Sequence, residues 1–388
     1  MFGKSFRLYL GIDKVNGNAS ISSTCPFHAP TKFTEAREMT VVAPIPITGP
    51  SVWSAQEMIR TDDWIVRLSA EDVTEIEHAH ALAKRNRRTG YVIDRTDFPL
   101  PHLSRKIDSW IDEIENGRGF LVVRGFPAKM SDEASLYDSY WGLGRHLGEA
   151  IIQNYEGRRI NEVRSRGHSY DAVNIRAYAT ASHLGFHNDP SDLTCLLCVR
   201  QAKSGGLSRI ASAAAIYNDI VVDHPEFLTP LCRGFHHDVR GEGPTGKLDE
   251  VTEIAIPVFS HFAGKLSCCL NTKAIATARE KMGGTLSSLE EEALAYIDER
   301  AMESDLRFEF MLEPGDILMM NNYTVLHART AFEDWETPER QRLLLRLWLN
   351  LYSGRPLADN FTGRFNTGHR GGAVIHNHTD ADLLAAEQ

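Results

Sequence analysis

The stretch SHLGFHNDP, residues 182–190, decides how this chain is interpreted. It places a histidine and an aspartate one residue apart, at His187 and Asp189, just before an apolar run at 193–199. A His-x-Asp pair completed by a distant histidine is the ligand set that holds non-haem Fe(II) and leaves coordination positions open. Because the apolar run predicts a buried strand, we expect it to hold both side chains in place at the mouth of a barrel.

The third ligand is expected in a second stretch, NYTVLH, residues 322–327, which ends at His327. Taken alone, His327 is equally well explained as a buried histidine at the end of a strand. Two rival groups occur at 224–226 (HPE) and 236–238 (HHD). The second rival precedes RGEGPTG, whose glycines and proline indicate a long exposed loop. We therefore favour the His187 stretch as the source of the ligands.

Arginines that follow the second stretch strengthen the assignment of His327. Arg342 and Arg346 are four residues apart, so in the strand predicted over 343–351 they share one face. A guanidinium is costly to bury without an anion, and its fork of donors suits a carboxylate. The pair therefore predicts that a dicarboxylate or an anionic substrate binds near the metal. Arg340, in contrast, is explained well by ion pairs at the surface.

The composition of the 388-residue chain excludes several classes of function. A formal net charge of -10 argues against non-specific binding to nucleic acid or to anionic membranes, which requires a basic surface. No apolar run approaches the roughly 20 residues of a membrane span, and the first ten residues lack a signal-peptide pattern. Cys195 and Cys198 have metal-like spacing, but residues three apart in a strand point to opposite faces. We expect a cytoplasmic protein with buried, reduced cysteines.

The order of predicted elements favours an α+β fold. Helical periodicity and capping signals come first, and short strand-like runs separated by turns dominate after residue 148. This order is typical of a β-sandwich or jelly roll with flanking helices. The predicted helices are 69–86, 104–117, from 131, 213–220 and 288–302; the predicted strands are 120–126, 173–178, 193–199, 208–212, 307–312, 317–320 and 343–351, with a hairpin of 254–259 and 265–270.

The ends of the chain lack such patterns. Residues 1–60 cluster Pro, Ser, Thr and Gly, which predicts an extended or partly disordered arm. We expect one catalytic domain at 61–352, and then a loose, polar and glycine-rich tail at 353–388.

Four motifs, in order along residues 105–352, resemble the taurine dioxygenase (TauD/TfdA) family of Fe(II)- and 2-oxoglutarate-dependent oxygenases. They are His187-x-Asp189, Gly205-Gly206-x-Ser208, the His327 segment and Arg342-x-x-x-Arg346. The resemblance implies a double-stranded β-helix (jelly roll) with inserted helices. It also implies Fe(2+) as the metal, with 2-oxoglutarate and O2 as co-substrates.

The resemblance assigns roles to these residues one by one. His187, Asp189 and His327 match the family's iron ligands. Arg342 matches the arginine that holds the distal carboxylate of 2-oxoglutarate, and Ser208 stands where the family often has a threonine contacting the same group. Arg346 matches an arginine near the metal-bound carboxylate, and it is expected to serve both catalysis and co-substrate binding.

The implied reaction is oxidation of an unactivated C–H bond of a small-molecule metabolite, with release of succinate and CO2. Hydroxylation is the expected outcome, and desaturation or cyclisation remains open. The presence of Asp189 argues against a halogenase, because no coordination position is vacant for halide. Members of this family are often dimers or tetramers, which is compatible with a homo-oligomer here.

The prime substrate is where the sequence is least informative. Gln153 and Asn154 align with the family's substrate-contacting segment, and His183 lies near the metal motif. Taurine users carry a histidine at about the position of Gln153 and an asparagine at that of His183, so both departures argue against taurine. We expect a larger or specialised metabolite, such as one of secondary metabolism.

Two other classes of function stay open on the residues alone. A hydrolase or lyase can use the same ligands with another metal such as Zn2+, although it has no need for Arg342 and Ser208. A jelly roll that only binds ligands is the other alternative, and an intact ligand set speaks against it.

Overall fold

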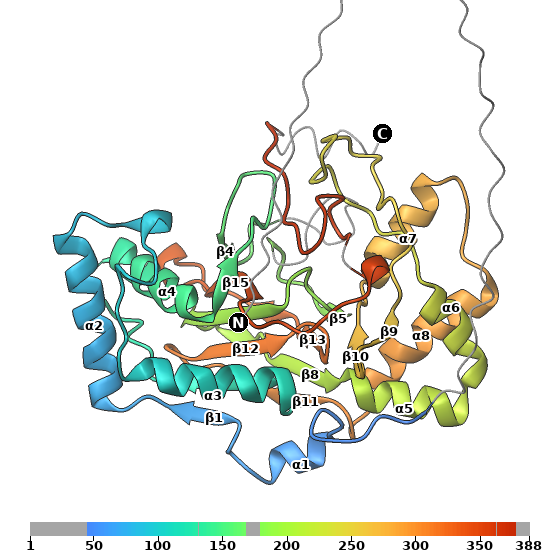
Figure 1. Cartoon of the computed structure of the whole chain (residues 1–388), viewed down its shortest axis with the longest axis horizontal. Helices are drawn as coiled ribbons and strands as arrows, with labels where there is room; N and C mark the ends of the chain where they lie inside the picture. Colours follow the sequence, from blue (N-terminus) through green and yellow to red (C-terminus); the bar gives the residue numbers. More distant parts are fainter. Residues whose placement is uncertain (1–44, 131, 168–178, 362, 378–388) are drawn as a thin grey trace, which may run out of the picture. The chain divides into compact units, whose positions relative to one another are not determined.

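The computed structural model describes residues 45–130, 132–167, 179–361 and 363–377 (Figure 1). The strand predicted at 173–178 and the first 44 residues of the predicted arm lie outside these described residues, as does the end of the predicted tail.

Two sheets form the framework of the described chain. The larger one has the strand order β1-β2-β12-β6-β15-β3, and β4 also pairs with β15. The smaller one has the order β11-β8-β13-β5. Strands of the larger sheet are β1 (Ile65–Arg67), β2 (Phe120–Arg124), β3 (Gly148–Ala150), β4 (Ile160–Val163), β6 (Leu193–Arg200), β12 (Ile317–Asn321) and β15 (Leu343–Leu351). Those of the smaller sheet are β5 (Leu184–His187), β8 (Ser208–Ser212), β11 (Phe308–Phe310) and β13 (Val325–Arg329).

Alternating side chains along the strands give the larger sheet two apolar faces. In β2, Phe120 and Val122 face the small sheet, where they pack with Ile210 and Val325 in one cluster. Leu121 and Val123 point the other way and join the cluster beneath the helices. The same period of two separates Cys195, in the outer cluster, from Cys198, in the inner one. The expectation of two buried thiols on opposite faces is confirmed.

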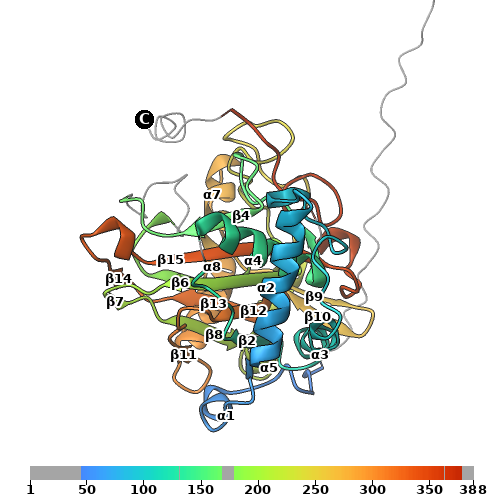
Figure 2. The ribbon, with the colours of Figure 1, turned by 90° about the vertical axis from the view of Figure 1, so that its left-hand side faces the viewer.

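Helices cover the outer faces of both sheets (Figure 2). Helices α2 (Ala70–Arg85), α3 (Leu103–Asn116) and α4 (Glu133–Leu147) contribute to the cluster on the larger sheet. Helices α5 (Ala213–Asp223), α6 (Leu228–Arg233), α7 (Thr272–Lys281) and α8 (Ser288–Met302) contribute to the cluster on the smaller one. Short 3-10 turns occur at Gly90–Val92, Pro225–Phe227, Pro338–Arg340 and Asp359–Phe361. The predicted α+β jelly roll with flanking and inserted helices is confirmed.

One predicted hairpin is displaced along the chain. Its strands are β9 (Phe259–Phe262) and β10 (Lys265–Cys268), rather than 254–259 and 265–270. Ala263 and Gly264 both have positive φ and form the tight turn that sets this register. Residue Ile256, assigned to the first strand by its apolar pattern, instead forms an isolated bridge with Phe235. A second minor pair joins β7 (Ser204–Gly205) to β14 (Phe332–Glu333).

The described parts of both chain ends are packed against the core, contrary to the extended arm and loose tail that we expected. Helix α1 (Ala55–Ile59) begins with a capping box of Ser54 and Glu57, and Trp53 is buried in the cluster between the sheets. After β15, Phe361 and Phe365 are also buried. The apolar residues of these segments are too widely spaced to show a period, which is why the sequence pattern missed them.

Candidate metal centre

Strands β5 and β13 bring the predicted ligands together. The two strands are antiparallel, and His187 lies directly opposite His327 in the register. The ring centroids of the two histidines are 4.2 Å apart. Asp189 follows β5 in the turn that leads into β6, so its carboxylate reaches the same point. Ligand atoms of the three residues all lie within 4.8 Å of one another.

The distances within this cluster suit a bound cation. His187 Nε2 is 3.8 Å from Asp189 Oδ1, and His327 Nε2 is 3.6 Å from Asp189 Oδ2. Both separations are too long for hydrogen bonds, so the three donors surround a common position without bonding to one another. Two imidazoles and a carboxylate are a ligand set for non-haem Fe(II). The described residues contain no other group of three or more potential ligands, which disfavours both rival groups.

The protonation of the cluster also fits a metal ion. Burial, followed by the nearby His327, lowers the pKa of His187 to about 3, so its imidazole is neutral and can ligate. Its Nδ1 lies 3.0 Å from the carbonyl oxygen of Gly185, a contact that orients the ring and leaves Nε2 for the metal. Burial alone would raise the pKa of Asp189, but Arg346 and the histidines hold it well below its ordinary value.

Two further donors fix the carboxylate of Asp189. Thr194 Oγ1 and Trp348 Nε1 both donate to Asp189 Oδ2, at 2.9 and 2.8 Å. Asn322 holds Thr194 in turn, through a 3.0 Å bond from its Nδ2 to Thr194 Oγ1. Sequence reasoning missed these supports. Thr194 and Trp348 are directly opposite each other in β6 and β15, a pairing that is visible only once the strand register is known.

A cavity beside the cluster contains three arginines. Arg329, Arg342 and Arg346 all line it, together with Ser208 and the three ligands. Arg342 and Arg346 thus share one cavity, as the strand spacing predicted. Arg346 Nη1 lies 3.4 Å from Asp189 Oδ1, whereas Arg342 lies farther from the metal, with Nη1 3.5 Å from the carbonyl oxygen of Val163.

Arg329 is a cavity residue that the sequence analysis missed. Its Nη2 donates to the carbonyls of Thr180 and Ser182, but Nε and Nη1 are buried without a partner. Burial, followed by the charge of Arg342, lowers the pKa of Arg329 to about 9. Burial lowers the pKa of Arg342 to about 10. Neither arginine forms an ion pair with a carboxylate of the described chain, so an anion would relieve the cost of burying both.

Strand alternation was the signal that could have found Arg329. It lies two residues after His327 in β13 and therefore on the same face. Across the sheet it is paired with Ser208 in β8, so the two side chains adjoin each other. The predicted 2-oxoglutarate residues Ser208 and Arg342 consequently come together with an arginine that no motif singled out.

The predicted substrate residues do not line this cavity. Gln153 is buried behind Arg346, accepting a 2.9 Å bond from Arg346 Nε and donating to the carbonyls of Arg346 and Arg159. Asn154 accepts from the backbone N–H of Arg158 within a turn. His183 is exposed. Gln153 is therefore placed to orient Arg346, whereas Asn154 and His183 have no contact with the metal cluster.

The 236–238 segment is not the exposed loop that its sequence indicated. His237 and Asp238 are only 5% and 7% exposed, because the 250–253 segment and helix α7 pack over them. Lys281 of α7 forms a 2.7 Å ion pair with Asp238. The glycines after this segment form turns within a packed loop, which composition cannot distinguish from an exposed one.

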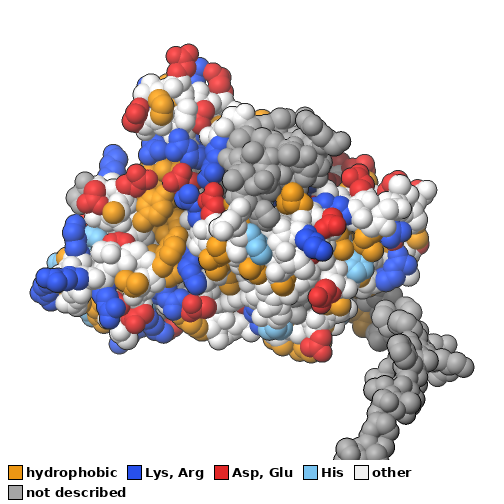
Figure 3. All heavy atoms as spheres, turned by 90° about the horizontal axis from the view of Figure 1, so that it is seen from above, with side chains coloured by type: hydrophobic (Ala, Val, Ile, Leu, Met, Phe, Trp, Pro, Cys, Tyr) orange, Lys and Arg blue, Asp and Glu red, His pale blue; other side chains and the backbone are white. Residues whose placement is uncertain are grey.

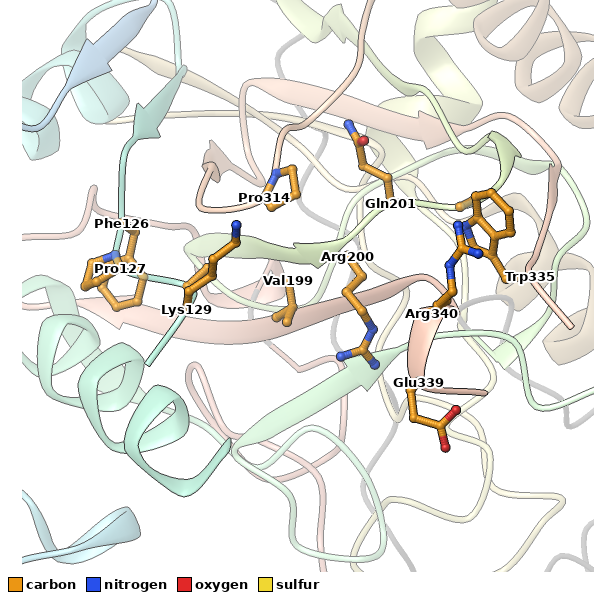
Figure 4. Close-up of a pocket in the computed structure, with 12 residues that line it drawn as sticks. Phe126, Pro127, Lys129, Val199, Arg200, Gln201, Pro314, Trp335, Glu339 and Arg340 are labelled. Carbon is orange, nitrogen blue, oxygen red and sulfur yellow. The ribbon is translucent and has the colours of Figure 1, made fainter. Parts of the chain in front are cut away.

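A larger cleft lies apart from the metal cluster (Figure 4). Its volume is about 620 Å3, and Phe126, Lys129 and Pro314 line it. Arg340 stacks on Trp335 at one end, with its guanidinium carbon 3.6 Å from the ring centroid. None of the metal ligands lines this cleft, and Arg340 is accordingly excluded from the metal site.

The surface agrees with the predicted absence of nucleic-acid and membrane binding. On the face drawn in Figure 3, acidic side chains lie among the basic ones. Within the described ranges, every helix is too short or too polar to cross a membrane.

Comparison with known proteins bears on this site. The profile of the family "Taurine catabolism dioxygenase TauD, TfdA family" matches residues 84–348. FR-33289 synthase of Streptomyces rubellomurinus is 32% identical over 80% of this chain and 92% of its own length. A taurine hydroxylase-like protein of Stachybotrys chartarum is 28% identical over 76% of this chain and 77% of its own.

Solved structures share the fold at low sequence identity. An asparagine oxygenase in complex with Fe(II), 3-hydroxyasparagine and succinate superposes with a TM-score of 0.57 at 18% identity, over 74% of this chain and 93% of that one. The non-haem iron oxygenase OrfP, in complex with (3S)-hydroxy-L-Arg, gives a TM-score of 0.52 at 12% identity, over 74% and 94%.

Proposed function

This chain belongs to the TauD/TfdA family and is an Fe(II)- and 2-oxoglutarate-dependent oxygenase, and on that premise we propose how its own residues divide the work. His187, Asp189 and His327 hold the iron. Bound there, Fe(II) supplies the activation of O2 that is coupled to oxidative decarboxylation of 2-oxoglutarate and to oxidation of a substrate C–H bond. The products are succinate, CO2 and, by our proposal, a hydroxylated metabolite.

The arginines bind and orient the co-substrate in this proposal. Arg342 and Arg329 receive the distal carboxylate of 2-oxoglutarate, with Ser208 beside them, because two buried guanidinium groups without carboxylate partners favour an anion. Arg346 lies closer to the metal cluster and adjoins the carboxylate at the iron end. Gln153 fixes the orientation of Arg346 from behind.

The observation that carries this proposal is the arrangement of a two-histidine, one-carboxylate cluster beside an uncompensated arginine pair. A hydrolase or lyase would need the metal cluster but not the arginine pair. The solved relatives support the co-substrate assignment, since OrfP has been crystallised with Fe and succinate and the asparagine oxygenase with Fe(II) and succinate.

An anaerobic titration tests the assignment. Addition of Fe(II) and 2-oxoglutarate to the wild-type protein is expected to give the weak visible charge-transfer band of the chelate. His187→Ala should abolish this band, and His224→Ala, at an exposed position outside the cluster, should leave it unchanged. A wild-type protein without the band, or a band that survives in His187→Ala, would refute the assignment.

We further propose a role in the secondary metabolism of a small molecule, since the relatives include FR-33289 synthase of Streptomyces. A cytoplasmic location and a homo-oligomer belong to the same proposal, as does a catalytic domain over 61–352. Gel filtration of the pure protein tests the oligomer.

A further inference from the structure

An arginine from beyond the family match reaches the metal-ligand segment. Arg364 Nη1 donates to the carbonyl oxygen of Asp189 at 2.8 Å and lies 3.5 Å from that of Asn188. Its Nη2 is buried and has no hydrogen-bond partner. In the described part of the chain no carboxylate forms an ion pair with Arg364. One half of this guanidinium is thus used by the protein, and the other half is a buried donor that requires an acceptor.

His237 is a second buried donor near this arginine. Its Nε2 also lacks a hydrogen-bond partner, and the residue is only 5% exposed. Burial, followed by the charge of Arg364, lowers the pKa of His237 to about 3, so the ring is neutral at physiological pH. A neutral imidazole offers one N–H donor, which can bond to an anion without a proton transfer.

Backbone and side-chain bonds hold the segments of these two residues together. Asn366, two residues after Arg364, donates to the carbonyl of Val251 and to the carboxylate of Glu250. Val251 is bridged to Asp238, the neighbour of His237. Phe365 and Val239 pack in one apolar cluster with Trp348, whose indole donates to Asp189. Figures 1 and 2 both show the C-terminal segment beside the loop that precedes α7.

We propose that Arg364 and His237 form an anion-binding position at the metal centre, which receives an anionic group of the prime substrate. The position is separate from the cavity of Arg329 and Arg342, which neither residue lines. It rests on the proposed function in assigning that cavity to 2-oxoglutarate. The substrate class is therefore a small metabolite that carries a carboxylate or a tetrahedral oxyanion such as a sulfonate or phosphonate.

Calorimetric titration of small anions tests this position without turnover. The protein is loaded with Zn2+ and saturating 2-oxoglutarate, so that the co-substrate cavity is occupied and no oxidation occurs. Propionate, ethanesulfonate and ethylphosphonate are then titrated in separate experiments. We expect saturable binding of at least one of them. Propionate alone would identify a carboxylate substrate, and either of the others a tetrahedral oxyanion.

Substitutions locate the binding. Arg364→Lys keeps the charge and a donor for the Asp189 carbonyl but loses the second N–H, and it should weaken binding by roughly tenfold or more. Arg340→Lys, in the separate cleft, is the matched control and should bind like the wild type. His237→Gln provides a second test if Arg364→Lys does not fold, and should also weaken binding.

Absence of saturable binding to the wild type overturns the proposal, as does an unchanged dissociation constant in Arg364→Lys. The two proposals fail separately. A missing charge-transfer band with Fe(II) and 2-oxoglutarate refutes the oxygenase assignment, whereas a normal band without anion binding refutes only the subsite.

Discussion

Replacement of Trp348 by phenylalanine should weaken metal binding through the carboxylate of Asp189. Trp348 is fully buried, and its Nε1 donates to Asp189 Oδ2 at 2.8 Å. The substitution retains an aromatic ring in the core but removes this donor. Thr194 still donates to the same oxygen at 2.9 Å, so the carboxylate keeps part of its support.

The size of the effect follows from these contacts. Loss of one hydrogen bond to a charged group costs about 1.5–3 kcal/mol, and outer partners of metal ligands typically change affinity by about 10- to 100-fold. Because Thr194 remains, we expect the low end, about tenfold or 1.4 kcal/mol. The variant should also lose stability, since the smaller ring leaves a void in the core.

A matched control separates the two effects. Trp141 is also a buried tryptophan, and its Nε1 donates to the carbonyl of Ile93 at 2.8 Å, within the helical layer and away from the metal cluster. Trp141→Phe should lower the melting temperature to a similar extent and leave metal affinity unchanged. Anaerobic Fe(II) titration against a competing chelator measures the affinity. Equal metal affinity in wild type and Trp348→Phe would refute this reasoning, as would an equal loss in both variants.

Three further predictions concern the arginines and a buried histidine. Arg342→Ala should raise the dissociation constant of 2-oxoglutarate by roughly a hundredfold while Fe(II) still binds; unaltered apparent affinity would remove Arg342 from the co-substrate site. 2-Oxoglutarate at a hundredfold excess over its dissociation constant should stabilise the metal-loaded protein by about 2.7 kcal/mol, and Arg329→Met should need roughly tenfold more ligand for the same melting temperature, with exposed Arg67→Met as the control. The pKa of His237 is lowered to about 3, against about 6.5 in an unfolded chain, so between these values the unfolded state binds the extra proton and stability falls as pH falls, by at most about 1.4 kcal/mol per pH unit. Urea unfolding at pH 7, 6 and 5 should show a shallower loss for His237→Gln and an unchanged one for His224→Gln, and identical slopes in all three proteins would contradict the burial argument.

The fold was largely predictable because its signals are local. Capping residues at Ser69 and Ser287 and the apolar alternation of β2 and β12 mark their elements without reference to the rest of the chain. The displaced hairpin shows the limit of such signals. There the turn at Ala263 and Gly264 sets the strands, and an apolar pattern alone could not locate it.

The metal ligands were predictable for a different reason, because two of them lie in one short motif. The support around them was not. Thr194 and Trp348 meet only through the pairing of β6 with β15, and Arg364 reaches Asp189 from a segment without periodicity. Substrate contacts at Asn154 and His183 were inferred by position along the family pattern, and the structure places neither beside the cavity.

The C-terminal segment gives this enzyme a part that can change independently of its barrel. Arg355, Arg364 and Arg370 fasten the segment to Glu115, to the Asp189 carbonyl and to Asp192, all by polar bonds to the core. The family match ends at Trp348, before all three. Grafting this segment and its partner loop between relatives would therefore exchange selectivity while leaving the iron ligands untouched, and a clone trimmed to the family boundary would discard it.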